Sequence, residues 1–363
     1  MHTLFLLVIL IGMAYLVHTL WFEFGRKPST TQLETRAHSG QFRAGVFQNE
    51  IDTPSQTGEF SYSKLIRELI HPSSTHRKPP AAIPSEKINL HSLLQQAPSI
   101  VWFGHSSYLL TLDGFTILVD PVMSGHSAPL PFLINSFKGT DIYSVDDLPP
   151  IDVLLITHDH YDHLDYDTVK RLKPKVKQVI TPLGCGEHLR FWGYDANIIT
   201  ELNWHASIAI GNQIITATPA RHFSGRAFGR NTTLWASYVL QSTTHKLYLG
   251  GDSGYGPHFK AIGEQYGPFD LALLESGQYN PAWAFIHMMP EETVQAAQDL
   301  NARVLMPVHW GKFVLSLHDW NEPIQRLTAA AQRHNQTIFT PTLGKAMPLH
   351  GDHPNNPWWE AVK

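Results

Sequence analysis

The segment that decides the fold is IDVLLITHDHYDHLD, residues 151–165. Its apolar and β-branched beginning predicts a buried β-strand over Ile151–Thr157, and a helical pattern follows over Asp165–Leu172. The strand-to-helix loop between them carries His158, His160, Asp162 and His163. Imidazole and carboxylate groups together bind Zn²⁺ or another divalent first-row ion, so the loop predicts a metal site at a strand end. A polar surface turn is the weaker interpretation, because a generic turn seldom gathers four such side chains.

Apolar runs and helical patterns alternate on both sides of this segment. Upstream, the Asp113-Gly114 turn joins two predicted strands, Ser107–Leu112 and Phe115–Val119. Further predicted strands are Ile100–Phe103, Gln178–Ile180, Gln213–Thr218, Leu234–Gln241, Lys246–Leu249, Asp270–Leu274 and Arg303–Val308, and further predicted helices are Pro290–Leu300 and Glu322–Arg333. Strands and helices are mixed throughout, which indicates an α/β or α+β domain with sheets covered by helices.

Charge, cysteine content and missing motifs exclude several functional classes. The 27 basic and 31 acidic residues give a net charge of −4, which offers nucleic acid no broad attraction. The single cysteine, Cys185, excludes an internal disulfide framework and an all-cysteine metal site. The sequence also lacks Gly-x-Ser-x-Gly, the Walker loop and His-Glu-x-x-His, so the usual competing hydrolase motifs do not apply.

A run without formal charge, Thr3–Phe22, lies near the amino terminus. As a helix it would be about 30 Å long, enough to cross the hydrocarbon core of a membrane. A cleaved signal peptide is the alternative, but bulky residues stand where small ones should precede a cleavage site. Trp21 followed by Arg26 and Lys27 is typical of an interface with positive charge on the inner side. We therefore expect a single-pass anchor with a cytoplasmic domain, and a periplasmic orientation stays open.

The loop His158-x-His160-x-Asp162-His163 resembles the signature of the metallo-β-lactamase superfamily. Three downstream positions of that family match His222 in TPARHFSGR, Asp252 in YLGGDSGYG and His309 in VLMPVHWG, each just past an apolar run. The resemblance implies an αββα sandwich of two sheets that holds two metal ions, expected to be Zn²⁺, at one edge. By the same resemblance, one ion would be held by His158, His160 and His222 and the other by Asp162, His163 and His309, with Asp252 and a hydroxide as bridges.

A narrower resemblance is to N-acylphosphatidylethanolamine-hydrolysing phospholipase D and its bacterial relatives, over roughly residues 99–325. It rests on WFGHSS, THDHYDHLD, GGDSGYG, HMMPEE and PVHWGKF. The resemblance implies cleavage of a phospholipid to phosphatidic acid and an N-acylethanolamine. It gives His287 a phosphate-facing or leaving-group role, with a surface position as the alternative. The expected catalytic residues are therefore Asp162, Asp252 and His287.

Two further residues are expected to support the ligands from behind. His105 follows the strand Ile100–Phe103 and either orients a ligand or is an ordinary buried histidine. Asp120 ends the strand Phe115–Val119, where it forms a strand-terminating turn unless it supports His158 or His160.

These observations predict a transmembrane anchor over residues 1–24, a linker and packing arm over 25–90 and a metallo-β-lactamase-fold hydrolase domain over 91–363. Within the arm, Lys64–Ile70 has the apolar face of a short docking helix. The expected partners are a phospholipid substrate and the membrane, with no nucleic acid and with a homodimer left open. A lactonase or another hydrolase of a small soluble substrate is the alternative enzyme, and a metal-holding scaffold without turnover is the non-enzymatic one.

Overall fold

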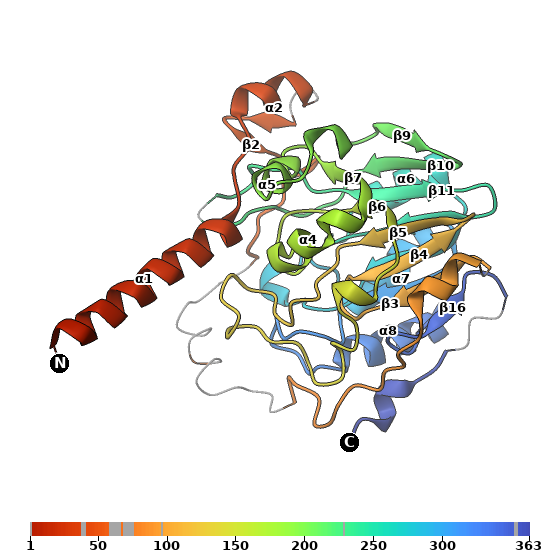
Figure 1. Cartoon of the computed structure of the whole chain (residues 1–363). Helices are drawn as coiled ribbons and strands as arrows, with labels where there is room; N and C mark the ends of the chain where they lie inside the picture. Colours follow the sequence, from red (N-terminus) through yellow and green to blue (C-terminus); the bar gives the residue numbers. More distant parts are fainter. Residues whose placement is uncertain are drawn as a thin grey trace.

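The computed structural model describes residues 2–37, 41–57, 67, 76–95, 97–227, 229–351 and 355–363. Of the helix expected over Lys64–Ile70, only Arg67 is among the described residues. Two seven-stranded sheets form the centre of the molecule, and helices lie on their outer faces (Figure 1). The structure therefore confirms the predicted αββα sandwich.

The first sheet has the order β16-β3-β4-β5-β6-β7-β8, antiparallel from β16 to β5 and parallel from β5 to β8. Its strands are β3 (Ser99–Trp102), β4 (Tyr108–Leu112), β5 (Phe115–Val119), β6 (Ile151–Leu155), β7 (Val176–Pro182), β8 (Ile199–Leu202) and β16 (Ala346–Pro348). Helices α4 (Tyr166–Leu172) and α5 (Gly186–Phe191) contribute to the apolar cluster on its outer face.

The second sheet has the order β15-β14-β13-β12-β11-β10-β9, antiparallel from β9 to β12 and parallel from β12 to β15. Its strands are β9 (Ser207–Ile210), β10 (Gln213–Thr218), β11 (Ser237–Gln241), β12 (Lys246–Leu249), β13 (Phe269–Glu275), β14 (Ala302–Val308) and β15 (Thr337–Ile338). Its helices are α6 (His258–Tyr266), α7 (Pro290–Asp299) and α8 (Glu322–Arg333).

The core follows from the alternation of side chains along each strand. Along β4, Leu110 and Leu112 belong to the cluster between the sheets, whereas Leu109 belongs to the cluster under α4 and α5. All three are fully buried, and burying one such side chain stabilises the fold by roughly 1.5–3 kcal/mol. Strands that are apolar on both faces therefore fix the two sheets against each other and against the helices, and this rigid frame carries the loops at the strand ends.

Two predicted strands exceed the strands of the structure by two or more residues. The strand predicted over Ile151–Thr157 ends at Leu155, because Thr157 turns its amide and hydroxyl toward the Asp120 carboxylate. The strand predicted from Leu234 begins at Ser237, because the preceding amides bond to other loops: Leu234 N donates to Leu183 O.

The amino-terminal helix α1 (His2–Phe24) projects from the domain (Figure 1). Its segment Phe5–Phe24 is long and apolar enough to cross a membrane, and its described side chains from Phe5 to His18 are exposed. A helix of this kind fits a membrane anchor or a signal sequence. After the short helix α2 (Thr30–Arg36), a hairpin of β1 (Phe42–Arg43) and β2 (Val46–Phe47) lies on the domain and buries Phe47.

Candidate metal centre

The seven predicted metal ligands converge at one edge of the sandwich. Each follows the carboxyl end of a strand, where side chains of neighbouring strands meet. Strand β6 leads into His158, His160, Asp162 and His163, β10 into His222, β12 into Asp252 and β14 into His309. Their ligand atoms fall into two groups, in each of which the atoms lie within 4.8 Å of one another.

The first cluster contains His158, His160, His222 and Asp252. His158 Nε2 lies 2.9 Å from His160 Nδ1, and His222 Nε2 lies 3.4 Å from the same atom. The Asp252 carboxylate approaches His158 and His222 to 3.8 and 3.7 Å. Three imidazoles and a carboxylate that point at one small volume form the donor set that Zn²⁺ and similar ions prefer.

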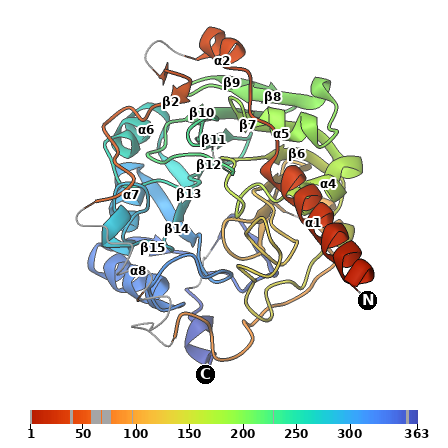
Figure 2. The ribbon, with the colours of Figure 1, turned by 90° about the vertical axis from the view of Figure 1, so that its left-hand side faces the viewer.

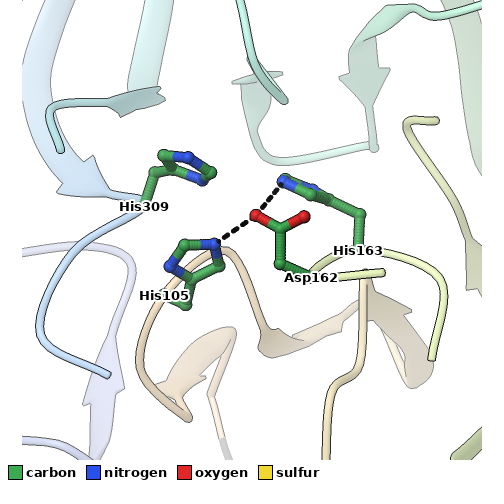
Figure 3. Close-up of side chains that lie close together, drawn as sticks. All are labelled: His105, Asp162, His163 and His309. Atoms are coloured by element: carbon green, nitrogen blue, oxygen red, sulfur yellow. Dashed lines mark hydrogen bonds and ion pairs between the residues drawn. The ribbon is translucent and has the colours of Figure 1, made fainter. Parts of the chain in front are cut away.

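The second cluster contains His105, Asp162, His163 and His309 (Figure 3). Asp162 Oδ2 lies between two rings, 2.9 Å from His105 Nε2 and 3.6 Å from His163 Nε2. The sequence leaves His105 as either a residue that orients a ligand or an ordinary buried histidine, and the structure places its ring beside Asp162, among the ligand side chains. His105 therefore either holds Asp162 in position through its Nε2–H group or donates a lone pair to a metal ion itself.

Asp252 joins the two clusters. Its carboxylate lies 3.2 Å from His163 Nε2 and 3.0 Å from His309 Nδ1, in addition to its contacts with the first cluster. Buried polar atoms normally have partners, yet among the described residues His163 Nε2 and Asp252 Oδ1 have none in hydrogen-bond geometry. Atoms of this kind, aimed into one volume, fit a bound cation. The residues present therefore fit a metal site, and Asp252 contacts histidines of both clusters.

Burial and charge prepare these groups for a cation. Burial lowers the pKa of His158, His222 and His309 well below the ordinary value, so their imidazoles are neutral and offer lone pairs. Burial raises the pKa of Asp252, but the neighbouring histidines, His163 first, outweigh it and hold that pKa well below its usual range. Neutral imidazoles around an ionised carboxylate are the protonation states that metal binding requires.

Hydrogen bonds to the ring nitrogens that face away from the clusters fix the orientation of His163 and His222. His163 Nδ1 donates to Asp120 Oδ2 at 2.7 Å, and His222 Nδ1 donates to Ile286 O at 2.8 Å, which leaves the Nε2 atom of each ring free. Asp120 also accepts from Thr157 N and Oγ1, at 2.8 and 2.6 Å. The sequence predicts that a supporting Asp120 would act on His158 or His160, and the structure places its carboxylate on His163 instead.

His287 lies at the same edge, paired with Glu275, which the sequence did not single out as a site residue. Its Nδ1 donates to Glu275 Oε2 at 2.6 Å, and both residues group with Asp252 and His309. Burial raises the pKa of Glu275 to about 7. For His287, burial lowers the pKa, but the Glu275 carboxylate outweighs it and raises the value to about 9. Glu275 is the last residue of β13, and a carboxylate that ends an apolar strand at the ligand edge was the available signal.

The chain is similar to known proteins in sequence and in fold. Residues 116–310 match the family model described as a beta-lactamase superfamily domain. An uncharacterized protein of Mycobacterium tuberculosis is 41% identical over 88% of this chain and 87% of its own length. An N-acyl-phosphatidylethanolamine-hydrolyzing phospholipase D of Caenorhabditis elegans is 35% identical over 62% of this chain and 67% of its own length. The solved structure of a metallo hydrolase from Ignicoccus hospitalis has a TM-score of 0.53 and 19% identity, covering 69% of this chain and 98% of that one.

The fold and the histidine and aspartate clusters define a metal-dependent hydrolase. With a family model that covers more than half of its length, the chain belongs to the metallo-β-lactamase superfamily.

Proposed function

We propose that the chain is a phosphodiesterase of the phospholipase D type, which hydrolyses N-acylphosphatidylethanolamine or a similar phospholipid to phosphatidic acid and an N-acylethanolamine. The observation that carries the proposal is the 35% identity, over 62% of this chain, to a phospholipase D with this substrate in its name. The apolar helix α1 supports it, because an anchor next to the site would confine the enzyme to its substrate and raise the effective substrate concentration.

We propose two Zn²⁺ ions as the cofactor. The first cluster would hold one ion, and Asp162, His163 and His309 would hold the other. Asp252 would contact both ions. When bound, two such cations lower the pKa of a water molecule toward neutrality and stabilise charge on the oxygens of an attacked phosphoryl group. The nucleophile of the reaction is then water, and the chain itself forms no covalent intermediate.

The side chains contribute proton transfer and orientation. When water attacks phosphorus, the bond from phosphorus to the ethanolamine oxygen breaks and that oxygen needs a proton. His287 is the candidate donor: it is partly exposed at the ligand edge, and the hydrogen bond to Glu275 fixes its ring. A histidine with a raised pKa carries the proton at neutral pH, as a general acid must.

The test uses the full-length protein loaded with Zn²⁺ in vesicles that contain N-acylphosphatidylethanolamine, in ¹⁸O-labelled water. We expect the label in phosphatidic acid and none in the released acylethanolamine, because attack at phosphorus leaves the new oxygen on the phosphate. The Asp252→Ala variant, measured in parallel, controls for contaminating lipases. Label in the alcohol would contradict the mechanism. Efficient lactone opening without lipid turnover would instead favour the lactonase alternative.

A further inference from the structure

The last turn of α1 accepts hydrogen bonds from side chains of the folded domain. The carbonyl groups at the end of a helix lack intrahelical partners and need others. Here Trp192 Nε1 donates to Phe22 O at 2.9 Å, and Arg226 donates to Glu23 O from Nε at 2.8 Å and from Nη2 at 2.6 Å. Just beyond the helix, Arg26 N donates to His188 Nδ1 at 3.1 Å. Side chains of the domain thus cap the helix that would cross the membrane.

Apolar contacts reinforce this joint. The ring of Phe22 stacks on Tyr166 and Phe191, with centroid distances of 5.7 and 5.6 Å. Glu23 is only 4% exposed, although it lies in the last turn of a helix whose described side chains from Phe5 to His18 are exposed. Aromatic stacking and burial at the end of a projecting helix fix its direction relative to the domain.

The same arginine also holds the metal-binding loop. Arg226 Nη1 donates to Asp159 O at 3.0 Å and to Leu164 O at 2.6 Å, and its guanidinium lies 4.1 Å from the centre of the Tyr161 ring. Asp159 and Leu164 enclose the ligands His160, Asp162 and His163. One buried guanidinium with its fixed fork of donors therefore joins α1 to both ends of this loop.

His188 makes a second connection along the same path. Its Nδ1 accepts from the chain after α1, and its Nε2 lies 3.2 Å from Asp159 Oδ2. The Asp159 carboxylate also accepts from Gly225 N at 2.7 Å and from Thr233 Oγ1 at 2.8 Å. Although Asp159 stands between two predicted ligands in the sequence, its side chain makes these hydrogen bonds and so helps to connect α1 to the metal-binding loop.

The face on which α1 leaves the domain carries further apolar side chains. The loop between β5 and β6 lies on the same side of the molecule as α1 in both views (Figure 2). Near the middle of this loop, Phe132 and Leu133 are 70% and 55% exposed, and Trp21 at the end of α1 is 65% exposed. Aromatic and apolar side chains beside an apolar span fit the interface of a lipid bilayer.

We propose that α1 is a rigid mount: the joint at Arg226 and His188 locks the membrane helix to the metal-binding loop, so that the face with Phe132 and Leu133 is held against the bilayer. A flexible tether would leave the domain free to rotate, whereas this joint fixes the orientation and makes metal retention depend on the helix end. The inference requires the metal centre and the apolar helix, but it is independent of the lipid substrate proposed above.

Gly25 offers a specific perturbation with a matched control. Its φ is +66°, and a Cβ at this position would overlap His188 Nδ1. Gly114 has a similar φ of +82° in the β4–β5 turn, but a Cβ there has nothing within 4 Å. Alanine at either position loses the glycine backbone preference, at a similar cost. Only Gly25→Ala also pushes the helix away from the domain.

The first measurement is the rate at which the Zn²⁺-loaded full-length protein, in phosphatidylcholine vesicles, loses metal to a chelator. We expect release about tenfold faster for Gly25→Ala than for the unaltered protein and little change for Gly114→Ala, because groups behind the ligands control metal affinity at this level. Equal release rates for Gly25→Ala and Gly114→Ala would overturn the proposal. Should Gly25→Ala fail to fold, Trp192→Phe removes one bond to the helix end while keeping the aromatic packing, and it should accelerate release in the same direction.

The second measurement is orientation. A fluorophore on Leu133→Cys should be quenched by nitroxide lipids, and one on Gln241→Cys should not, since Gln241 is the exposed last residue of β11 and that strand runs away from the metal edge. The native Cys185 is buried and does not compete for the label. Gly25→Ala should reduce the quenching at position 133. Equal quenching at both positions, or quenching unaffected by Gly25→Ala, would contradict a rigid mount.

Discussion

Replacing Asp120 with asparagine should weaken metal binding without removing a ligand. The carboxylate accepts a hydrogen bond from His163 Nδ1 and two from Thr157. An asparagine can accept through only one of its two terminal atoms. At the place of Oδ1 its amide NH2 would meet Thr157 N, which is itself a donor, so the NH2 should take the place of Oδ2 and face both Thr157 Oγ1 and His163 Nδ1. The His163 ring would then favour the tautomer with its proton on Nε2. That proton occupies the position of the metal.

The size of the effect follows from the bond that is lost. A hydrogen bond to a charged group contributes about 1.5–3 kcal/mol, which corresponds to a factor of roughly 10–150 in a binding constant. The measured range for groups behind metal ligands, about 10–100-fold, agrees with this value. We therefore expect the Kd for Zn²⁺ to rise by 10–100-fold, measured by competition with a chromogenic chelator.

Asp152 provides the control for this experiment. Like Asp120, it is bonded to a threonine amide and hydroxyl: at the opposite end of β6, its Oδ2 accepts from Thr116 N and Oγ1, both at 2.9 Å, and its Oδ1 accepts from Lys177 Nζ at 2.7 Å. Asp152→Asn should therefore perturb the fold in a similar way and leave the Kd for Zn²⁺ unchanged. If Asp120→Asn bound Zn²⁺ as tightly as Asp152→Asn, the tautomer argument would be refuted.

Three further predictions concern the clusters, the leaving group and the helix. Asp252→Ala should lower the metal content at both clusters, because its carboxylate contacts histidines of each, and full double occupancy by elemental analysis would exclude a bridging role. His287→Gln should lower kcat more for lipids with basic leaving groups than for analogues with acidic ones. An equal loss in kcat for both would exclude proton donation by His287. The full-length chain should require detergent for extraction because of Phe5–Phe24, and uncleaved protein in the soluble fraction after lysis would contradict an anchor.

The ligands at strand ends could be predicted because their signal is local. His222, Asp252 and His309 each follow an apolar run, and the strands that the runs form end at the same edge. A buried strand fixes both the position and the direction of the residue that follows it. For the same reason, the predicted strands Phe115–Val119 and Gln213–Thr218 agree with β5 and β10 in both bounds.

The position of His105 depends on tertiary contacts that no local pattern reveals. It follows β3 in a turn with φ of +52°, and backbone bonds connect it to the end of β14: His105 N donates to Trp310 O at 2.9 Å and His309 N donates to His105 O at 3.0 Å. These bonds between the two sheets bring the imidazole to Asp162. The sequence indicates a histidine after a strand but not the distant loop that faces it. Asp120 and Glu275 are similar, since each acts through a residue far away in the sequence or on another element.

The charge balance of the centre links metal binding to pH. Asp252 and Glu275 are buried beside His309, and Asp162, whose side chain is 13% exposed, also groups with that histidine, so carboxylates gather where unpaired negative charge is costly. Burial lowers the pKa of His163, but the carboxylates of Asp252, Asp162 and Asp120 outweigh it and raise that pKa well above the ordinary value, so without metal a proton on His163 offsets part of the charge. This stabilisation is present at low pH and is lost as pH rises through the raised pKa. A cation must displace that proton to reach Nε2, so metal affinity should increase with pH across the same range, and chelator competition at several pH values measures the slope.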